Sequence, residues 1–225
     1  MKMNIDEIEI DDIQRIFDSG SQYSLSHLNH CKVTCNIAFR YAIMKKWIRP
    51  EDDFMKYIKI KSKASRKTIH KPFTMEETVR TDNSMESKIV MVYLLTGCRA
   101  SELLDVSEIH DEYIVCGLKT ESGKSRKIPI HPIIKPYYKI ALKRLSGQTY
   151  KKLSGMFKKM MNKYGMDHTI HDTRYTFATL GKEYNMKPSA VKKIMGHKLQ
   201  DLTDDVYTHE SIEYLKNEIE KIVIN

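Results

Sequence analysis

The stretch HDTRYTFAT places a histidine and an arginine, His171 and Arg174, three residues apart at the expected start of a helix. That spacing puts both side chains on one helix face. His197 follows 26 residues after His171 in MGHK, Tyr207 follows ten residues later in VYTHE, and Arg99 lies upstream in TGCRASELL. Two arginines, two histidines and a tyrosine in this order suit chemistry on a phosphodiester, with the tyrosine as nucleophile.

Each residue type has a physical reason to be there. An arginine fork makes two parallel bonds to phosphate oxygens and keeps its charge, although Glu102 beside Arg99 and Asp172 beside Arg174 also permit structural ion pairs. Histidines can bond phosphate oxygens or move protons near neutral pH. A tyrosine nucleophile conserves the bond energy in a covalent phosphotyrosine, so a strand can be rejoined without ATP. Since no Gly-rich phosphate loop or acidic metal triad is evident, we expect no cofactor and no metal.

These motifs, in this order and spacing, resemble the tyrosine recombinases, the phage-integrase family of DNA strand-exchange enzymes. The closest similarity is to integrases of phages and conjugative elements of Gram-positive bacteria. The resemblance covers residues 72–215 well and 5–60 loosely. It implies that Arg99, Arg174 and His197 bind the phosphate and that His171 assists removal of the proton from the tyrosine.

Three positions leave the resemblance open to question. Lys119, at the end of a strand in GLKTESGKSRKIPIH, matches the family's hairpin lysine that protonates the leaving 5′ oxygen, but Lys124 and Lys127 compete for that role. Many relatives have histidine where this chain has Tyr175, which we interpret as a change in the wall of the site. The nucleophile has neighbouring rivals that lack its motif and its spacing, namely Tyr184 and Tyr214.

Sequence periodicity predicts a mainly α fold with a small β-sheet or hairpin. The expected strands are 112–117 and 126–131, joined by the turn ESGKS. Apolar residues at helical spacing mark two helices, with Val33, Ile37, Tyr41 and Met44 in one and Met85, Ile89, Val92 and Tyr93 in the other. The expected helices are 5–19, 24–47, a short one from Thr74, 84–95, 132–145, 149–164, 171–184, 188–195 and 210–222.

The charge distribution points to a polyanionic partner. The net charge is +9 and the sequence pI is about 9.2, which fits double-stranded DNA but does not exclude an ordinary basic protein. Residues 56–71 are dense in Lys and Arg and contain no acid. Such a block is usually a solvated linker, yet it also suits phosphate contacts. The predicted DNA-binding residues within it are Lys59, Lys61, Lys63 and Arg66.

We therefore predict a partial helical core-binding region at 1–55, a basic linker at 56–71 and a catalytic domain at 72–225. The family usually has about two more helices before this point, so both a fragment and a naturally short member fit the sequence. The C-terminal stripe has two readings: packing on its own domain, or the slightly favoured docking on a neighbouring protomer. Its apolar members are Ile212, Leu215, Ile219 and Ile222.

The remaining expectations concern location, cysteines and assembly. The acidic N-terminus has no signal-peptide core and no run of 18 apolar residues exists, so we expect a cytoplasmic protein with no membrane partner. His27, Cys31 and Cys35 share a helix face, but half-buried helix positions are a better interpretation than zinc. By resemblance, the enzyme is a site-specific recombinase that acts as a homo-tetramer on DNA.

Two alternatives stay open. One is a nicking-closing topoisomerase with similar residues, which would relax a supercoiled plasmid lacking any recognition site. The other is a DNA-binding regulator that kept the fold and lost catalysis, which would form no covalent DNA adduct.

Overall fold

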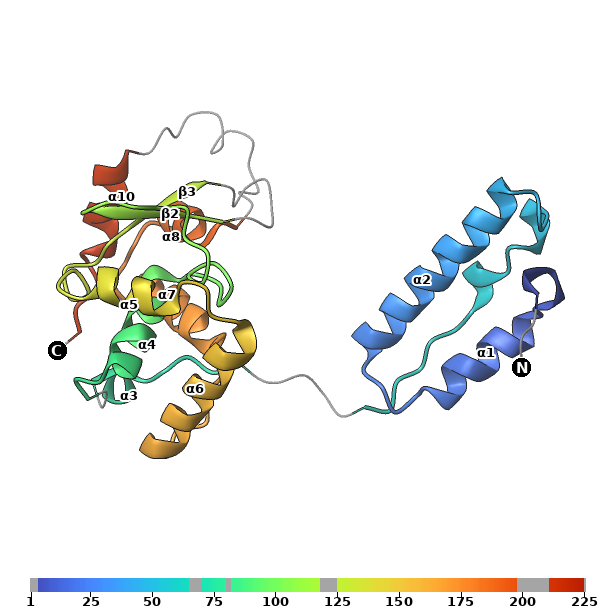
Figure 1. The fold of residues 1–225 in the computed structure, drawn as a ribbon, viewed down its shortest axis with the longest axis horizontal. Coiled ribbons are helices and arrows are strands. Elements are labelled where there is room, and N and C mark those ends of the chain that lie inside the picture. Colours follow the sequence, from blue (N-terminus) through green and yellow to red (C-terminus); the bar gives the residue numbers. More distant parts are fainter. Residues whose placement is uncertain (1–3, 65–69, 80–81, 118–124, 198–210, 225) are drawn as a thin grey trace. The chain divides into compact units, whose positions relative to one another are not determined.

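The structure, a computed structural model, describes residues 4–64, 70–79, 82–117, 125–197 and 211–224. The chain forms two compact units, Met1–Thr68 and Ile69–Asn225, which are described separately (Figure 1). No helix within the described ranges is both long enough and apolar enough to cross a membrane.

The first unit is built on two helices, α1 (Ile10–Ser19) and α2 (Leu25–Met44). The Ser24 side chain accepts a hydrogen bond from the His27 N–H and so begins α2 as the sequence predicts. The expected helix at 5–19 is interrupted, because a 3₁₀ turn, η1 (Ile5–Glu7), precedes α1. Two further 3₁₀ turns follow, η2 (Pro50–Asp52) and η3 (Met55–Tyr57).

The apolar stripe predicted on α2 does not face the core of this unit. Its four members, Val33, Ile37, Tyr41 and Met44, are between 49 and 76% exposed. The opposite face is buried instead, where Leu28, Phe39 and Ala42 join the small core with residues of α1 and η3. The spacing identified the helix correctly but could not identify the covered face.

Part of the predicted basic linker is an extended segment that packs on the first unit. Ile58 is buried in its core. The backbone N–H of Lys59 donates to Gln14 Oε1 at 2.9 Å, and that of Lys63 donates to the Ser21 carbonyl at 2.7 Å. The Lys32 ammonium donates to the Ile58 carbonyl at 2.6 Å. These bonds fasten residues 58–63 to the first unit, and the division between the two compact units falls after Thr68, inside the predicted linker.

The centre of the second unit is helix α4 (Met85–Thr96), which is buried around its whole circumference from Ile89 to Thr96. Three helices pack on it: α5 (Tyr138–Leu145), α6 (Tyr150–Tyr164) and α7 (Asp172–Glu183) (Figure 1). The stripe predicted on α4 covered only part of its buried surface, since a helix that is apolar all round lies inside a domain. Two shorter helices are α3 (Met75–Val79) and α8 (Pro188–Met195).

Gly97 sets the distance between α4 and α7. It ends α4 with φ +60°, a left-handed conformation that glycine adopts without strain. A Cβ atom built there would lie 2.6 Å from the Phe177 ring of α7. Glycine therefore lets the loop that follows α4, which carries Arg99, approach α7.

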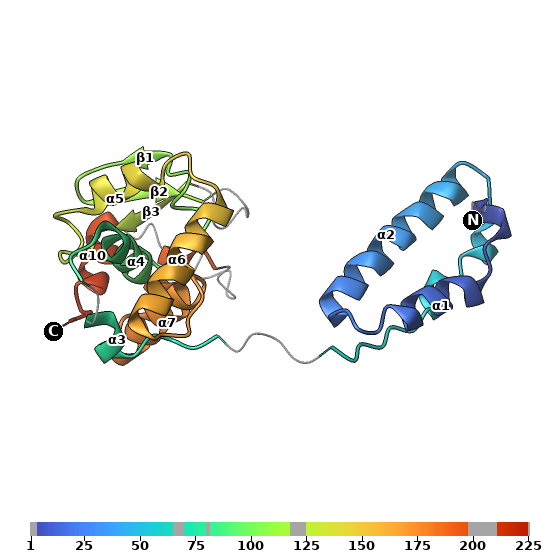
Figure 2. The ribbon, with the colours of Figure 1, turned by 60° about the horizontal axis from the view of Figure 1, so that its bottom comes forward.

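The sheet has three antiparallel strands in the order β1-β2-β3 (Figure 2). The predicted hairpin is confirmed as β2 (Tyr113–Cys116) and β3 (Arg126–Pro129), with Cys116 opposite Arg126. Its turn lies outside the described residues. Strand β1 (Glu108–Ile109) was missed because two residues carry no periodic signal.

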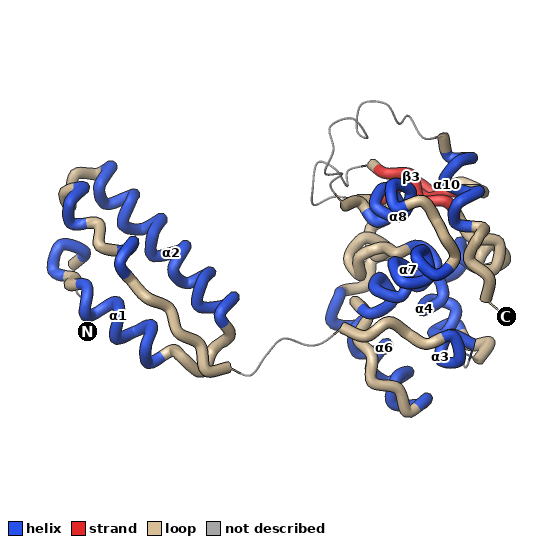
Figure 3. The backbone as a smooth tube through the Cα atoms, turned by 180° about the vertical axis from the view of Figure 1, so that it is seen from behind, coloured by secondary structure: helices blue, strands red, loops and turns tan. Residues whose placement is uncertain are grey.

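The C-terminal segment packs on its own domain. Helix α10 (Ile212–Ile219) lies against β3 and α8 (Figure 3). Leu215, Ile219 and Ile222 are at most 2% exposed. The Tyr184 hydroxyl donates to the Val223 carbonyl at 2.5 Å, fastening the residues after the helix. In the single chain, this stripe therefore packs on its own domain, and docking on a neighbouring protomer stays a prediction.

Candidate active site

Arg174 is held inside the second unit by neutral groups. It lies in the first turn of α7 and is 4% exposed. One terminal nitrogen donates to the Gly97 carbonyl and the other to the Met195 carbonyl, each at 2.6 Å. Burial, followed by the charge of Arg99, lowers the pKa of this guanidinium to about 10. Arg174 is thus still a cation at neutral pH, but no carboxylate is hydrogen-bonded to it among the described residues.

Arg99 is oriented by a buried carboxylate. The Arg99 side chain donates to Glu102 Oε1 at 2.8 Å, and its backbone N–H donates to Oε2 at 2.6 Å. Arg126 from β3 donates to the same two oxygens at 3.0 and 2.7 Å. Although burial alone would raise the pKa of Glu102, hydrogen bonds and charge from Arg126, with help from Arg99, lower it to about 2. Glu102 is therefore ionised and links the Arg99 loop to the sheet.

His197 completes this cluster at the end of α8. Gly196 ends the helix with φ +66°, and the next residue, His197, places Nε2 2.8 Å from a terminal nitrogen of Arg174. Because arginine can only donate, Nε2 accepts and Nδ1 carries the hydrogen. Burial, then the charge of Arg174, lowers the pKa of His197. The neutral ring can therefore offer its Nδ1–H to an incoming anion.

Arg174 is a buried cation held by neutral partners. Arg99 and Arg126 both bond the Glu102 carboxylate, whereas Arg174 bonds two backbone carbonyls and His197, and no carboxylate within the described ranges. A buried cation without a bonded anion is costly. Binding of a phosphate dianion or phosphodiester would relieve that cost.

His171 lies at the N-terminus of α7 beside the cluster. Burial, then the charges of His70 and Arg174, lowers its pKa. Its ring meets His70 edge-on, with centroids 4.9 Å apart, and meets Tyr175 edge-on at 5.4 Å. Tyr175, the position that departs from the family pattern, thus forms part of an aromatic wall.

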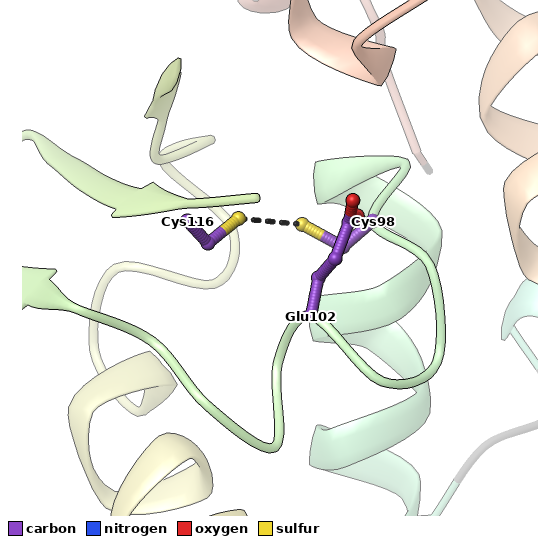
Figure 4. A group of neighbouring side chains, drawn as sticks. All are labelled: Cys98, Glu102 and Cys116. Carbon is purple, nitrogen blue, oxygen red and sulfur yellow. Dashed lines mark hydrogen bonds between the residues drawn. The ribbon is translucent and has the colours of Figure 1, made fainter. Parts of the chain in front are cut away.

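A second group of side chains invites comparison with a metal site. Cys98, Glu102 and Cys116 each offer one ligand atom, all within 4.8 Å of one another. Figure 4 shows the two sulfurs pointing toward each other from the loop after α4 and the end of β2, 3.7 Å apart. However, both Glu102 oxygens already accept arginine hydrogen bonds, and a divalent cation would sit beside the Arg126 guanidinium. The group is better suited to support the Arg99 loop than to bind a metal.

Four of the six expected catalytic residues thus lie in one place in the structure: Arg99, His171, Arg174 and His197. Lys119 and Tyr207 lie outside the described residues, as does Arg66 of the basic segment. Asp172 does not pair with Arg174 as the sequence allowed, because its carboxylate bonds His70 and Thr169.

Sequence reasoning missed two members of this region. Arg126 alternates with Ile128 on β3, and both are buried, so strand periodicity was a usable signal for an inward arginine. His70 is 102 residues from its partner Asp172, and no local pattern could have paired them.

Comparison with known proteins places this site in a family. Residues 69–213, which include all four described catalytic candidates, match the phage integrase family. The chain is a member of the phage integrase family. Two curated relatives are named tyrosine recombinase XerA. The one from Saccharolobus solfataricus is 32% identical over 142 residues, which are 58% of this chain and 47% of the relative.

The second relative, from Pyrococcus furiosus, is 27% identical over 181 residues, which are 69% of this integrase-family chain and 63% of the relative. The chain therefore spans less than two thirds of the length of these curated relatives. Because the shared region is incomplete, the activity and partners of the whole protein are taken up below as proposals.

Solved integrases share the fold. The Tn1549 transposon integrase in complex with circular intermediate DNA is 21% identical, covers 97% of this chain and 87% of that chain, and has a TM-score of 0.65. The lambda integrase tetramer bound to a Holliday junction is 17% identical, with coverages of 92% and 68% and a TM-score of 0.67. Together with the elements described above, this likeness confirms the predicted mainly α fold with a small sheet.

Proposed function

We propose that this chain is the catalytic portion of a tyrosine site-specific recombinase, which integrates or excises a mobile element. It cuts one strand of double-stranded DNA at a time, holds the strand through a 3′-phosphotyrosyl bond and rejoins it to a partner duplex. The enzyme acts in the cytoplasm of the host cell, where that DNA is found. Family membership and the two recombinase relatives support this activity.

The proposed cleavage step follows from the roles of the site residues. The Tyr207 phenolic oxygen attacks phosphorus, and its proton passes to the neutral imidazole of His171. The bond between phosphorus and the 5′ oxygen breaks, and that oxygen takes a proton from the Lys119 ammonium. Arg99, Arg174 and His197 bond the non-bridging oxygens and stabilise their developing charge. Rejoining is the reverse step with the 5′ hydroxyl of another strand.

One observation carries the proposal: the buried Arg174 guanidinium is held by the Gly97 and Met195 carbonyls and by His197, with no carboxylate bonded to it in the described part of the chain. A structural ion pair would instead bring a carboxylate to it. A buried guanidinium fixed by neutral groups is preorganised for an incoming anion. A guanidinium pair also supplies the field that a metal ion provides in other phosphoryl-transfer sites.

A suicide-substrate assay tests the proposal. A nicked duplex from the element's own attachment site should trap the chain on DNA as an SDS-stable adduct, also in EDTA. Tyr207→Phe should form no adduct while DNA affinity stays nearly unchanged, because only one hydroxyl is removed. An adduct with that variant would exclude Tyr207 as the nucleophile, and Tyr214 would be the next residue to test. Relaxation of a plasmid without any attachment site would instead support a topoisomerase.

The proposal extends to assembly on DNA. The lambda integrase neighbour is a tetramer bound to a Holliday junction, so we propose four protomers of this chain on two duplexes. In the first unit, Lys59, Lys61 and Lys63 all point into solvent, alternating with the part-buried Ile60 and Ser62. Three ammonium groups on one side of an extended segment suit successive backbone phosphates, and Arg66 is assigned the same role.

A further inference from the structure

We propose that His70 is a further positioning residue of this active site: its imidazole, held by the Asp172 carboxylate, packs against His171 and fixes that ring for proton transfer. This inference rests on the proposed function. His70 Nδ1 lies 2.7 Å from Asp172 Oδ1. The His70 ring stacks on Tyr175 with centroids 4.8 Å apart and an interplanar angle of 14°, and it meets the His171 ring edge-on at 4.9 Å.

Asp172 is a rigid anchor for His70. Its side chain is 4% exposed, and it is the first residue of α7, the helix that also carries Arg174. Oδ2 accepts the Thr169 N–H at 2.6 Å and the Thr169 hydroxyl at 3.0 Å. The other oxygen, Oδ1, is thereby directed at His70. Since a carboxylate accepts, Nδ1 of His70 carries the hydrogen and the ring orientation is fixed.

The chain segment that carries His70 is fastened to the same helix. The Phe73 N–H donates to Thr176 Oγ1 at 2.8 Å, and the Phe73 ring stacks on His168 at 3.9 Å. The position of His70 is therefore fixed by its own ring contacts and by the bonds of the residues that follow it. Its side chain is 28% exposed.

The groups around His171 show what the His70 ring does there. Arg174 and Asp172 face it from α7, Arg99 faces it from the loop after α4, and His70 faces it from the segment before α3. After burial, His70 is the largest of the influences that keep the pKa of His171 low. A neutral His171 is the form that can accept the tyrosine proton. Removing His70 should free the His171 ring and raise its pKa.

The chain contains a matched arrangement that serves as a control. His110 Nε2 lies 2.8 Å from Glu108 Oε2, and its ring stacks on Tyr113 with centroids 4.3 Å apart. This histidine also pairs with a carboxylate and stacks on a tyrosine, but it sits at the β1–β2 edge and contacts none of the site residues. His110→Phe therefore reproduces the change in packing and pairing without touching His171.

The experiment compares His70→Phe, His70→Asn and His110→Phe in the full chain. Single-turnover cleavage of the nicked duplex is followed across pH, with DNA affinity and thermal unfolding measured in parallel. His70→Phe should cleave roughly tenfold more slowly, less than the ~10²–10⁴ of a direct proton-transfer group. DNA affinity should hold, and the acid limb of the pH–rate profile should move to higher pH. His70→Asn, which keeps a donor for Asp172, should recover part of the rate, and His110→Phe should behave as the unmodified chain.

Cleavage by His70→Phe at the unmodified rate, with an unmoved acid limb, would overturn the inference. A rate loss matched by His110→Phe, or one accompanied by unfolding, would also overturn it. If the unmodified chain forms no adduct at all, the proposed function fails. The His70 inference is then tested without DNA, by NMR titration of the His171 imidazole. His70→Phe should raise the His171 pKa, and an unchanged pKa would show that the His70 ring does not influence His171.

Discussion

Glu102, Arg126 and Arg174, at the candidate site of the second unit, are buried and hydrogen-bonded, whereas the basic segment of the first unit exposes its charges to solvent. Glu102 is 5% exposed, Arg126 8% and Arg174 4%, and their partners come from three different elements. Lys59, Lys61 and Lys63 have exposed side chains, and the backbone N–H groups of Lys59 and Lys63 are hydrogen-bonded to the first unit. Replacing these charged residues of the second unit should therefore change both the unfolding free energy and the cleavage rate. Replacing the lysines of the first unit should change only the electrostatic attraction to DNA.

The strongest test of this contrast is Glu102→Gln. This change leaves Arg99 and Arg126 without their carboxylate in a buried setting, which costs about 3–5 kcal/mol of unfolding free energy. Urea unfolding of the full chain would measure it. Glu108→Gln is the matched control, because Glu108 is 61% exposed and pairs with His110 on the surface, and such pairs contribute at most about 1 kcal/mol. Equal losses in the two variants would contradict the contrast.

Replacement of the phosphate-facing arginines separates chemistry from stability. Arg99→Ala and Arg174→Ala should each slow cleavage by roughly 10²-fold or more, the effect of losing a preorganised donor. Arg174→Ala should also lower the unfolding free energy by about 1–3 kcal/mol, because the carbonyls of Gly97 and Met195 lose their donors. Of the two, Arg99 is the more exposed, with 29% of its side chain accessible.

Single-turnover cleavage and thermal unfolding would be measured on the same preparations. Arg15→Ala is the control, since Arg15 is 77% exposed and pairs only with Asp12 of its own helix. That variant should change neither quantity appreciably. If Arg174→Ala unfolds the chain yet the folded fraction cleaves at the full rate, Arg174 is a structural residue only.

Local patterns were enough to predict the hairpin and most helices of the second unit, but not strand β1. Ser84 and Gly97 mark the ends of α4, and the strands of the hairpin alternate as expected. The motif HDTRYTFAT predicted a helix start that carries Arg174. These features depend on residues within about one helical turn of each other, so the sequence contains them directly.

What the sequence could not predict depends on contacts between distant segments. The exposed and the buried apolar faces of α2 have similar spacing in the sequence. Which face is buried depends on the surface that packs against the helix. The Asp172 carboxylate lies two residues from Arg174 but bonds His70, 102 residues away. The basic segment had the composition of a solvated linker, yet the Lys59 and Lys63 backbones bond to α1 and to the turn after it.

Acidification should weaken the second unit through His197. Burial and the Arg174 charge hold its folded-state pKa below the ordinary value of 6.5, so the unfolded chain binds the proton first. The associated stability is present above about pH 6.5 and is lost as pH falls through the folded-state pKa. His197→Gln should therefore show a shallower loss of unfolding free energy between about pH 7 and pH 5. Identical slopes for both proteins would show that the ring titrates freely.

The smallest effect per residue is expected from the lysines of the first unit. Each lysine that neutralises a phosphate contributes about −0.9 to the slope of log K against log salt concentration. Replacing Lys59, Lys61 and Lys63 with alanine should flatten that slope and weaken cognate and random DNA alike, because backbone phosphates are common to all sequences. The unfolding free energy should hold, since their side chains are exposed and the backbone bonds to Gln14 and Ser21 do not depend on them.

The control replaces the same three lysines with arginine, which keeps the charge and should keep the slope. An unchanged slope in the alanine variant would show that this segment has a structural role and none in DNA binding. An equal loss of DNA affinity in the alanine and arginine variants would mean that side-chain shape, and not charge, determines the contact.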